Sequence, residues 1–253
     1  MHTTESLRDI PPALQSKSLH LLTENTPNGK KVQILLEELR IANQITWETH
    51  LIDLESEEQK KDWFLALNPN GRIPLLYDNT PDLPICVMES SAILIYLHEN
   101  FDKDKIFGFD TADERSQAFQ WLFFWHAAAP IQGQTRHFSD RLGESFLYVN
   151  TRLRNEMLRI YSVLDDHLSG KHRYSITRDY IAGAGVGKYS IADIGTWPHV
   201  RAWRSLGFSH DDMLAYPHLL EWISRVADRP GVQIGISDKY DSEENPSLIV
   251  RGI

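Results

Sequence analysis

The pattern of apolar and polar residues follows two different periods along the chain, and the change comes at about residue 112. The short apolar run at 19–23 predicts a buried strand, and apolar residues at positions 32, 35, 36 and 39 mark one face of a helix. The pattern then predicts a strand over 45–53, a short helix over 57–67, a hairpin of strands at 73–77 and 84–89, and a helix over 90–101 with Ser90 as its N-cap. This β-α-β-α-β-β-α order predicts an α/β domain.

From about residue 112 onward the periodicity is helical. Long helical segments are predicted over roughly 113–138, 146–168, 191–206 and 216–228, and the polar, glycine-containing stretch 170–190 is expected to be a surface connection. An α/β part followed by an all-α part predicts two domains. We place them at 18–103 and 112–234, with an extended arm at 1–17 and a polar tail at 235–253.

Composition and charge narrow the functional classes. The net charge of -9 disfavours a nucleic-acid partner. No apolar run approaches the ~20 residues of a membrane span, and no secretory leader opens the chain, so a cytoplasmic protein without a membrane partner is expected. The single cysteine, Cys86, excludes an internal disulfide, and in its predicted strand it is expected to be a small buried hydrophobe. The histidines show no ligand spacing, so no metal is expected.

The turn Thr26-Pro27-Asn28-Gly29 joins the first strand to the first helix. The unpaired N–H groups of a helical first turn attract anions, and the Thr26 hydroxyl and Asn28 amide add two donors. Such surroundings lower the pKa of a thiol from ~8.5 to between ~3.5 and ~7.5. An ordinary capped turn would use the same residues, and both interpretations stay open. Two lysines, at positions 30 and 31, lie near the positive end of the helix dipole, which is unfavourable unless an anion binds there. Alternatively, both side chains are simply solvated.

Two further stretches offer groups for a peptide-like ligand. Pro74 stands at a strand entry, and a cis Ile73-Pro74 bond would turn the Ile73 backbone groups outward for pairing; a purely structural proline is the alternative. Glu89 and Ser90 precede a helix and would offer a carboxylate to an amine, and N–H groups to a carboxylate; by themselves they also make a good cap. The three stretches together indicate a receptor for a small zwitterionic peptide that carries a thiol.

These motifs, at 26–29 (TPNG), 68–74 (NPNGRIP) and 89–91 (ESS), resemble the glutathione transferases. The chain is most similar to the nu-class bacterial disulfide-bond reductases and to the fungal transferases related to the yeast nitrogen-regulatory prion protein. The resemblance runs from about 18 to 230 and includes YSIADIGTWPHV at 189–200. It implies a thioredoxin-like N-terminal domain, an all-α C-terminal domain and a homodimer.

The resemblance also implies glutathione as co-substrate and assigns it eight residues, namely Thr26, Asn28, Gln59, Arg72, Ile73, Pro74, Glu89 and Ser90. The first two would activate the sulfur without a covalent bond, because the turn holds no cysteine. Ile73 would pair with the cysteinyl backbone. Glu89 and Ser90 would hold the γ-glutamyl end, and Gln59 with Arg72 would reach the glycyl carboxylate.

The second domain is expected to supply the pocket for the other substrate. Its candidate residues are Trp125, Gln134, Arg136 and His137, although core packing is the alternative role for the aromatic residues. Ser190 and Asp193 are assigned to a helix cap, and Trp197 to the core.

The function that the resemblance implies is a glutathione transferase that directs the thiolate onto a carbon, a peroxide oxygen or a disulfide sulfur. The alternatives are a disulfide-bond reductase that uses two glutathiones per turnover, and a non-catalytic glutathione-binding regulator. The regulator is disfavoured because the yeast relative acts through an Asn/Gln-rich arm, and the residues at 1–17 are not of that kind.

Overall fold

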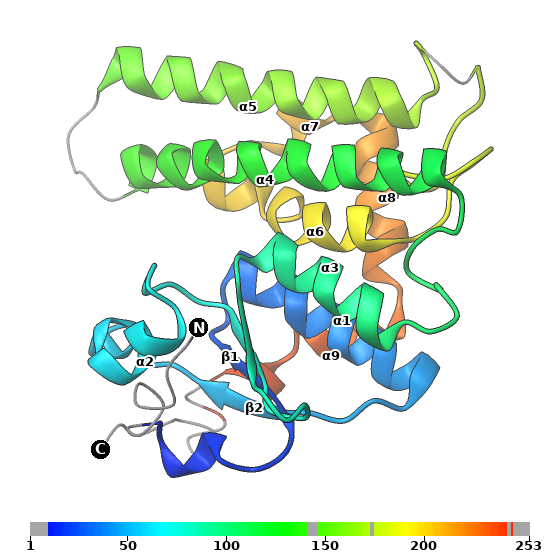
Figure 1. The fold of residues 1–253 in the computed structure, drawn as a ribbon. Coiled ribbons are helices and arrows are strands. Elements are labelled where there is room, and N and C mark those ends of the chain that lie inside the picture. Colours follow the sequence, from blue (N-terminus) through cyan, green and yellow to red (C-terminus); the bar gives the residue numbers. More distant parts are fainter. Residues whose placement is uncertain (1–9, 141–145, 173–174, 242–243, 245–253) are drawn as a thin grey trace. The chain divides into compact units, whose positions relative to one another are not determined.

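The computed structural model describes residues 10–140, 146–172, 175–241 and 244 (Figure 1). The chain forms two compact units. One comprises the residues up to Phe101 together with those from Pro230 onward, and the other runs from Asp102 to Arg229.

The first unit is built on a four-stranded sheet. Its strands are β1 (Leu19–Thr23), β2 (Glu48–Leu51), β3 (Leu75–Asp78) and β4 (Ile85–Met88), in the order β2-β1-β3-β4. β1 and β2 are parallel, whereas β3 is antiparallel to both β1 and β4. β3 begins only after Pro74, because proline has no N–H to donate to a ladder. The predicted hairpin is present, and β1, α1 and β2 form a parallel βαβ unit.

The helices of the first unit are η1 (Pro12–Leu14), α1 (Pro27–Asn43), η2 (Glu58–Lys60), α2 (Asp62–Leu67), α3 (Ser90–Phe101), α9 (Pro230–Gly235) and η4 (Asp238–Tyr240). Of these, α1, η2, α2 and α3 lie close to predicted positions, whereas the three short helices η1, α9 and η4 were not predicted. The single helix expected over 57–67 is therefore two short pieces, since Lys61 between them is extended, with ψ of 151°.

The expected arm at 1–17 differs from the structure where it is described. Residues 1–9 lie outside the described part, but Ile10 and Leu14 are buried and join a core cluster with Leu22 and Phe64. The two prolines between them allow a single 3-10 turn, Pro12–Leu14, that presents Leu14 inward. The packed part of the chain consequently begins before Ser18.

Residues after Pro230 return to the first unit. α9 packs along α1 (Figure 1). Glycine is required at Gly235, because a Cβ there would lie 2.7 Å from the Ile34 Cα. Further on, the Tyr240 hydroxyl donates to the buried Glu37 carboxylate at 2.7 Å. Burial alone would raise the pKa of Glu37, but hydrogen bonds from Lys239, Tyr240 and Arg40 hold it below its usual value. The segment 230–234, expected in the helical domain, therefore lies with the first unit.

The second unit has helices and no strand among its described residues. These are α4 (Ala112–Asp140), α5 (Leu147–Leu168), α6 (Ile191–Val200), η3 (Trp203–Leu206), α7 (His210–Met213) and α8 (Pro217–Ala227). α4 and α5 run side by side (Figure 1). The helix predicted over 191–206 ends at Val200 and continues as a 3-10 turn. None of the helices in the described ranges is both long and apolar enough to cross a membrane.

Asp193 organises the start of α6, as predicted. It closes a capping box with Ser190, and its carboxylate also accepts from the Ile181 N–H at 3.0 Å and the Trp222 indole at 2.9 Å. Burial raises the pKa of Asp193 to about 6. Trp197 is 1% exposed, so its predicted place in the core is confirmed. These contacts assign Asp193 to folding.

Candidate functional site

The turn between β1 and α1 is tightly built. Gln33 Nε2 donates to Thr23 Oγ1 at 3.1 Å and to the Glu24 carbonyl at 3.3 Å, which ties the helix to the end of the strand. Gly29 is required, because a Cβ there would overlap the Glu24 carbonyl oxygen. Thr26 is the N-cap, and its Oγ1 accepts from the Gly29 N–H at 3.1 Å. The Thr26 O–H has no acceptor among the described residues and is available to a ligand.

A buried lysine lies behind the turn. Lys31 is 1% exposed, and its Nζ donates to Ser90 Oγ at 3.4 Å. Ser90 Oγ in turn donates to Asn28 Oδ1 at 3.3 Å, so the Asn28 NH2 group remains for a ligand. Burial lowers the pKa of Lys31 to about 7 because it disfavours the charged form, while Glu89 opposes this shift. The interpretation of Lys31 as a solvated side chain is wrong.

The second part of the site is the segment that leads into β3. Asn68 fixes its shape, since Asn68 Nδ2 donates to the Arg72 carbonyl at 2.8 Å and Asn68 Oδ1 accepts from the Asn70 N–H at 3.0 Å. The Ile73-Pro74 peptide bond is cis. Within the described residues, the Ile73 N–H and C=O have no hydrogen-bond partner, so both are available to an extended peptide.

The third part is the start of α3. The helix begins at Ser90, and its first bond runs from the Ile93 N–H to the Glu89 carbonyl at 2.9 Å. Glu89 thus occupies the N-cap position with φ of 69°, and the prediction of Ser90 as N-cap is wrong by one residue. The reason is that Ser90 turns its hydroxyl toward Asn28 rather than toward its own helix. Asn70 Nδ2 donates to the Glu89 carboxylate at 3.1 Å.

The three parts surround one hollow of about 390 Å³, a size within the range of small-molecule sites. All eight residues assigned to glutathione line it. Three other lining residues, Leu54, Asn68 and Asn70, were not assigned to glutathione, although the last two belong to the 68–74 motif. The hollow offers the cation of Arg72 and the anion of Glu89, with neutral donors between them. It therefore matches a zwitterion with a central nucleophile.

The pocket residues predicted in the second unit are not gathered in this way. Trp125 is completely buried, with its ring 5.8 Å from that of His199. Gln134, Arg136 and His137 are exposed on α4. Their role in binding a second substrate stays a prediction.

Cys86 was expected to be buried and is exposed. It lies on β4, an edge strand of which three of the four positions are exposed. The apolar residues on either side of it led to the wrong expectation, because an edge strand has a partner on one side only.

Comparison with known proteins identifies the family. Residues 26–100 match the model of the glutathione S-transferase N-terminal domain, and residues 148–225 match that of the C-terminal domain. The chain belongs to the glutathione transferase family. The resemblance inferred from the three motifs and the two-part fold expected from it are thereby confirmed.

Individual transferases and relatives show the same likeness. The disulfide-bond oxidoreductase YfcG of Escherichia coli is 33% identical over 210 residues, which cover 81% of this chain and 88% of the relative. A glutathione transferase homologue from Lodderomyces elongisporus, with two glutathione molecules per subunit, is 33% identical with a TM-score of 0.75, over 87% of this chain and 98% of the other. A transferase from Pseudomonas putida, with one glutathione disulfide per subunit, is 30% identical with a TM-score of 0.78. The match covers 89% of this chain and 94% of the other.

Proposed function

We propose that this protein is a glutathione-dependent transferase that binds glutathione in the hollow at the start of α1. The observation that carries the proposal is the gathering of all eight assigned residues around that hollow. Glu89 would accept the γ-glutamyl amine, and Arg72 with Gln59 would bind the glycyl carboxylate. Ile73 would pair with the cysteinyl backbone by its free N–H and C=O.

The sulfur would lie at the first turn of α1. There the Thr26 O–H, the Asn28 NH2 group and the Asn28 N–H are the donors that the turn leaves for it, since Pro27 has no N–H and the Gly29 N–H donates to Thr26 Oγ1. Donors of this kind stabilise a thiolate and lower its pKa, which raises the fraction of nucleophile at neutral pH. The turn has no thiol of its own, so the protein would orient and ionise the sulfur of glutathione without a covalent bond.

A disulfide is the electrophile that the relatives favour. Structures of related transferases hold two glutathiones or one glutathione disulfide per subunit, and YfcG is named a disulfide-bond oxidoreductase. In the proposed reaction the bound thiolate attacks a disulfide RSSR, forms the mixed disulfide GSSR and releases RS⁻, which takes up a proton. A second glutathione thiolate then releases the other RS⁻ and leaves glutathione disulfide. Transfer to an aryl carbon or a peroxide is the alternative outcome.

One preparation tested with three substrates decides between these reactions. We expect turnover of hydroxyethyl disulfide to exceed that of an aryl halide and an organic peroxide. Asn28→Ala should raise the pKa of bound glutathione, followed through the ultraviolet absorbance of its thiolate, and slow all three reactions. Asn43→Ala, at the far end of the same helix, serves as the control. A thiolate midpoint equal to that of free glutathione would contradict the proposal, and glutathione binding without any turnover would favour the regulator.

We also propose a homodimer that works in the cytoplasm. The support for the dimer is the resemblance to the family, and the support for the compartment is the need for reduced glutathione, which the cytosol maintains. Light scattering should give twice the mass of the chain.

We further propose that Gln134, Arg136 and His137, which are exposed on α4, contact the second substrate. Their replacement by alanine should then change the KM for the electrophile and leave glutathione binding unaltered.

A further inference from the structure

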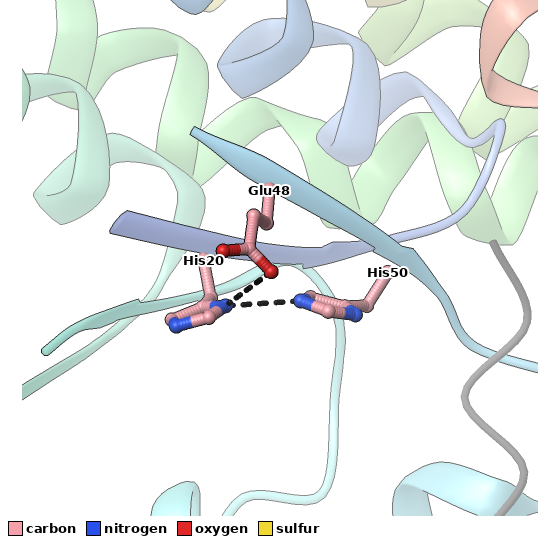
Figure 2. Close-up of side chains that lie close together, drawn as sticks. All are labelled: His20, Glu48 and His50. Carbon is pink, nitrogen blue, oxygen red and sulfur yellow. Dashed lines mark hydrogen bonds and ion pairs between the residues drawn. The ribbon is translucent and has the colours of Figure 1, made fainter. Parts of the chain in front are cut away.

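Three side chains that commonly bind metals meet on one face of the sheet of the first unit. His20 on β1 lies directly opposite Glu48 on the parallel strand β2, and His50 follows two residues later. Because side chains alternate along a strand, all three project from the same face. Figure 2 shows the two imidazole rings and the carboxylate converging there. None of the three residues lines the hollow at α1.

The distances suit a small divalent ion. His20 Nδ1 is 3.0 Å from His50 Nε2 and 3.8 Å from Glu48 Oε2, and one ligand atom from each residue lies within 4.8 Å of the others. Two ligands at ~2.0–2.1 Å from a tetrahedral ion are about 3.3 Å apart. The imidazole pair is therefore already near the required separation. The carboxylate must approach by a small amount, which its side chain, 44% exposed, is free to do.

Ser16 provides the supporting contacts that metal ligands usually have. Its carbonyl lies 3.1 Å from His20 Nε2, and a carbonyl only accepts, so Nε2 carries the ring proton and Nδ1 presents its lone pair to the cluster. The Ser16 hydroxyl donates to Glu48 Oε1 at 2.6 Å and leaves Oε2 for the imidazoles. On the other side, the ring of Tyr77 stacks on that of His20 at 5.8 Å. Ligand orientation by such contacts typically changes metal affinity 10–100-fold.

We propose that His20, Glu48 and His50 bind one divalent transition-metal ion of the zinc type, with a water molecule as the fourth ligand. A set of two imidazoles and one carboxylate suits Zn²⁺ and its neighbours in the transition series, and it does not suit Mg²⁺ or Ca²⁺, which prefer oxygen ligands only. On binding, the ion takes the place of the proton between the two rings, and the His50 proton moves from Nε2 to Nδ1. The ion would link β1 to β2 and stabilise the first unit when it binds.

The competing interpretation is a hydrogen-bonded network without an ion. In that case the His50 Nε2–H donates to His20 Nδ1, and Glu48 contributes only through Ser16. The two interpretations differ in two measurable ways. Only the metal site binds one ion per chain, and only there does replacing Glu48 weaken ion binding.

The test uses the untagged full-length chain, stripped by a chelator and then dialysed against Zn²⁺ alone. We expect one equivalent of bound zinc, visible d–d absorption bands typical of tetrahedral coordination when Co²⁺ is used, and a higher denaturant midpoint with zinc than without. Glu48→Gln should weaken binding at least tenfold, and Ser16→Ala by 10–100-fold without removing a ligand. Glu55→Gln, another exposed carboxylate of the first unit, should bind as the parent chain does.

Two results would overturn the proposal. One is the absence of zinc binding by the parent chain. The other is an equal zinc affinity of the parent chain, Glu48→Gln and Ser16→Ala, which would place the ion elsewhere. His50→Gln should abolish binding, but His50 is buried, and if this variant does not fold, the two variants at exposed positions still decide. The measurements need no glutathione, so their outcome is independent of the proposed activity.

Discussion

Replacing Lys31 with methionine is expected to stabilise the fold while it weakens glutathione binding. Lys31 is 1% exposed, and burial lowers its pKa from 10.5 to about 7. In the unfolded chain the same group is charged up to about pH 10.5. At pH 7 the unfolded chain thus holds a proton that the folded chain partly lacks, and folding carries a free-energy cost.

The size of that cost follows from the shift. A difference of 10.5 minus about 7 is about 3.5 units, at ~1.36 kcal/mol each. At pH 7, where half of the folded molecules are still protonated, the cost is about 4 kcal/mol. Methionine fills a similar volume, and loss of the hydrogen bond to Ser90 reduces the expected gain in stability by about 1 kcal/mol. We therefore expect Lys31→Met to raise the free energy of unfolding at pH 7 by about 3 kcal/mol.

Urea unfolding at several pH values measures this effect. The folded-state pKa of Lys31 is depressed, so the cost of burying it is full below about pH 7, shrinks as pH rises, and disappears above the unfolded value of 10.5. The parent chain should gain about 3 kcal/mol between pH 7 and 9.5 relative to Lys31→Met. Lys30→Met, on the neighbouring and less buried lysine, is the matched control and should follow the parent chain.

Binding of glutathione provides the second half of the prediction. Without the Lys31 donor, Ser90 is no longer held against Asn28, and calorimetry should show weaker binding. A variant that is less stable at pH 7 than the parent, or a parent whose stability does not change relative to the variant between pH 7 and 9.5, would refute the reasoning about the buried charge.

Three further changes test other contacts. Glu89→Gln should raise the KM for glutathione at least tenfold with little change in kcat, because it removes the charge opposite the γ-glutamyl amine; an unchanged KM argues against that assignment. Gly29→Ala should lower the thermal midpoint and abolish glutathione binding, since the new methyl group meets the turn backbone; unchanged binding would show that the turn can relax. Tyr240→Phe should cost about 1–3 kcal/mol in urea unfolding, because a buried carboxylate, Glu37, loses a donor. A neutral result there would show that Lys239 and Arg40 suffice.

The sequence predicts the parts of the structure that rest on local patterns. The apolar run of β1 and the helical spacing of Val32, Leu35 and Leu39 each contain enough information to identify an element. The eight site residues were accessible only through the resemblance to the glutathione transferases, which three short motifs carry; turn and cap chemistry alone left the ordinary capped turn open. The structure brings these residues together around one hollow.

What the sequence did not predict depends on contacts between distant segments. Lys31 lies near the start of α1, and in the sequence it is indistinguishable from a solvated lysine; its burial comes from α3, whose Ser90 is 59 residues away. His20 and His50 are 30 residues apart and meet only because β1 and β2 pair in parallel. The alternation of Glu48 and His50 within a predicted strand was the one available sign of a shared face.

Isolated apolar residues in polar segments were equally hard to interpret. Ile10 and Leu14 are separated by a proline pair, and Tyr240 stands in a polar stretch, yet all three are buried. No periodicity exists over so few residues, so a sequence pattern gives no signal.

The return of the chain to the first unit has a consequence for synthesis on the ribosome. α1 presents Glu37 and Ile34 to residues of the segment that begins at Pro230, which emerges about 130 residues after Phe101. At 5–20 residues per second this leaves that side of the helix uncovered for roughly 6 to 26 s. A nascent first unit is therefore incomplete until the segment from Pro230 has emerged, and chaperones that bind exposed apolar surface can reach α1 during that time.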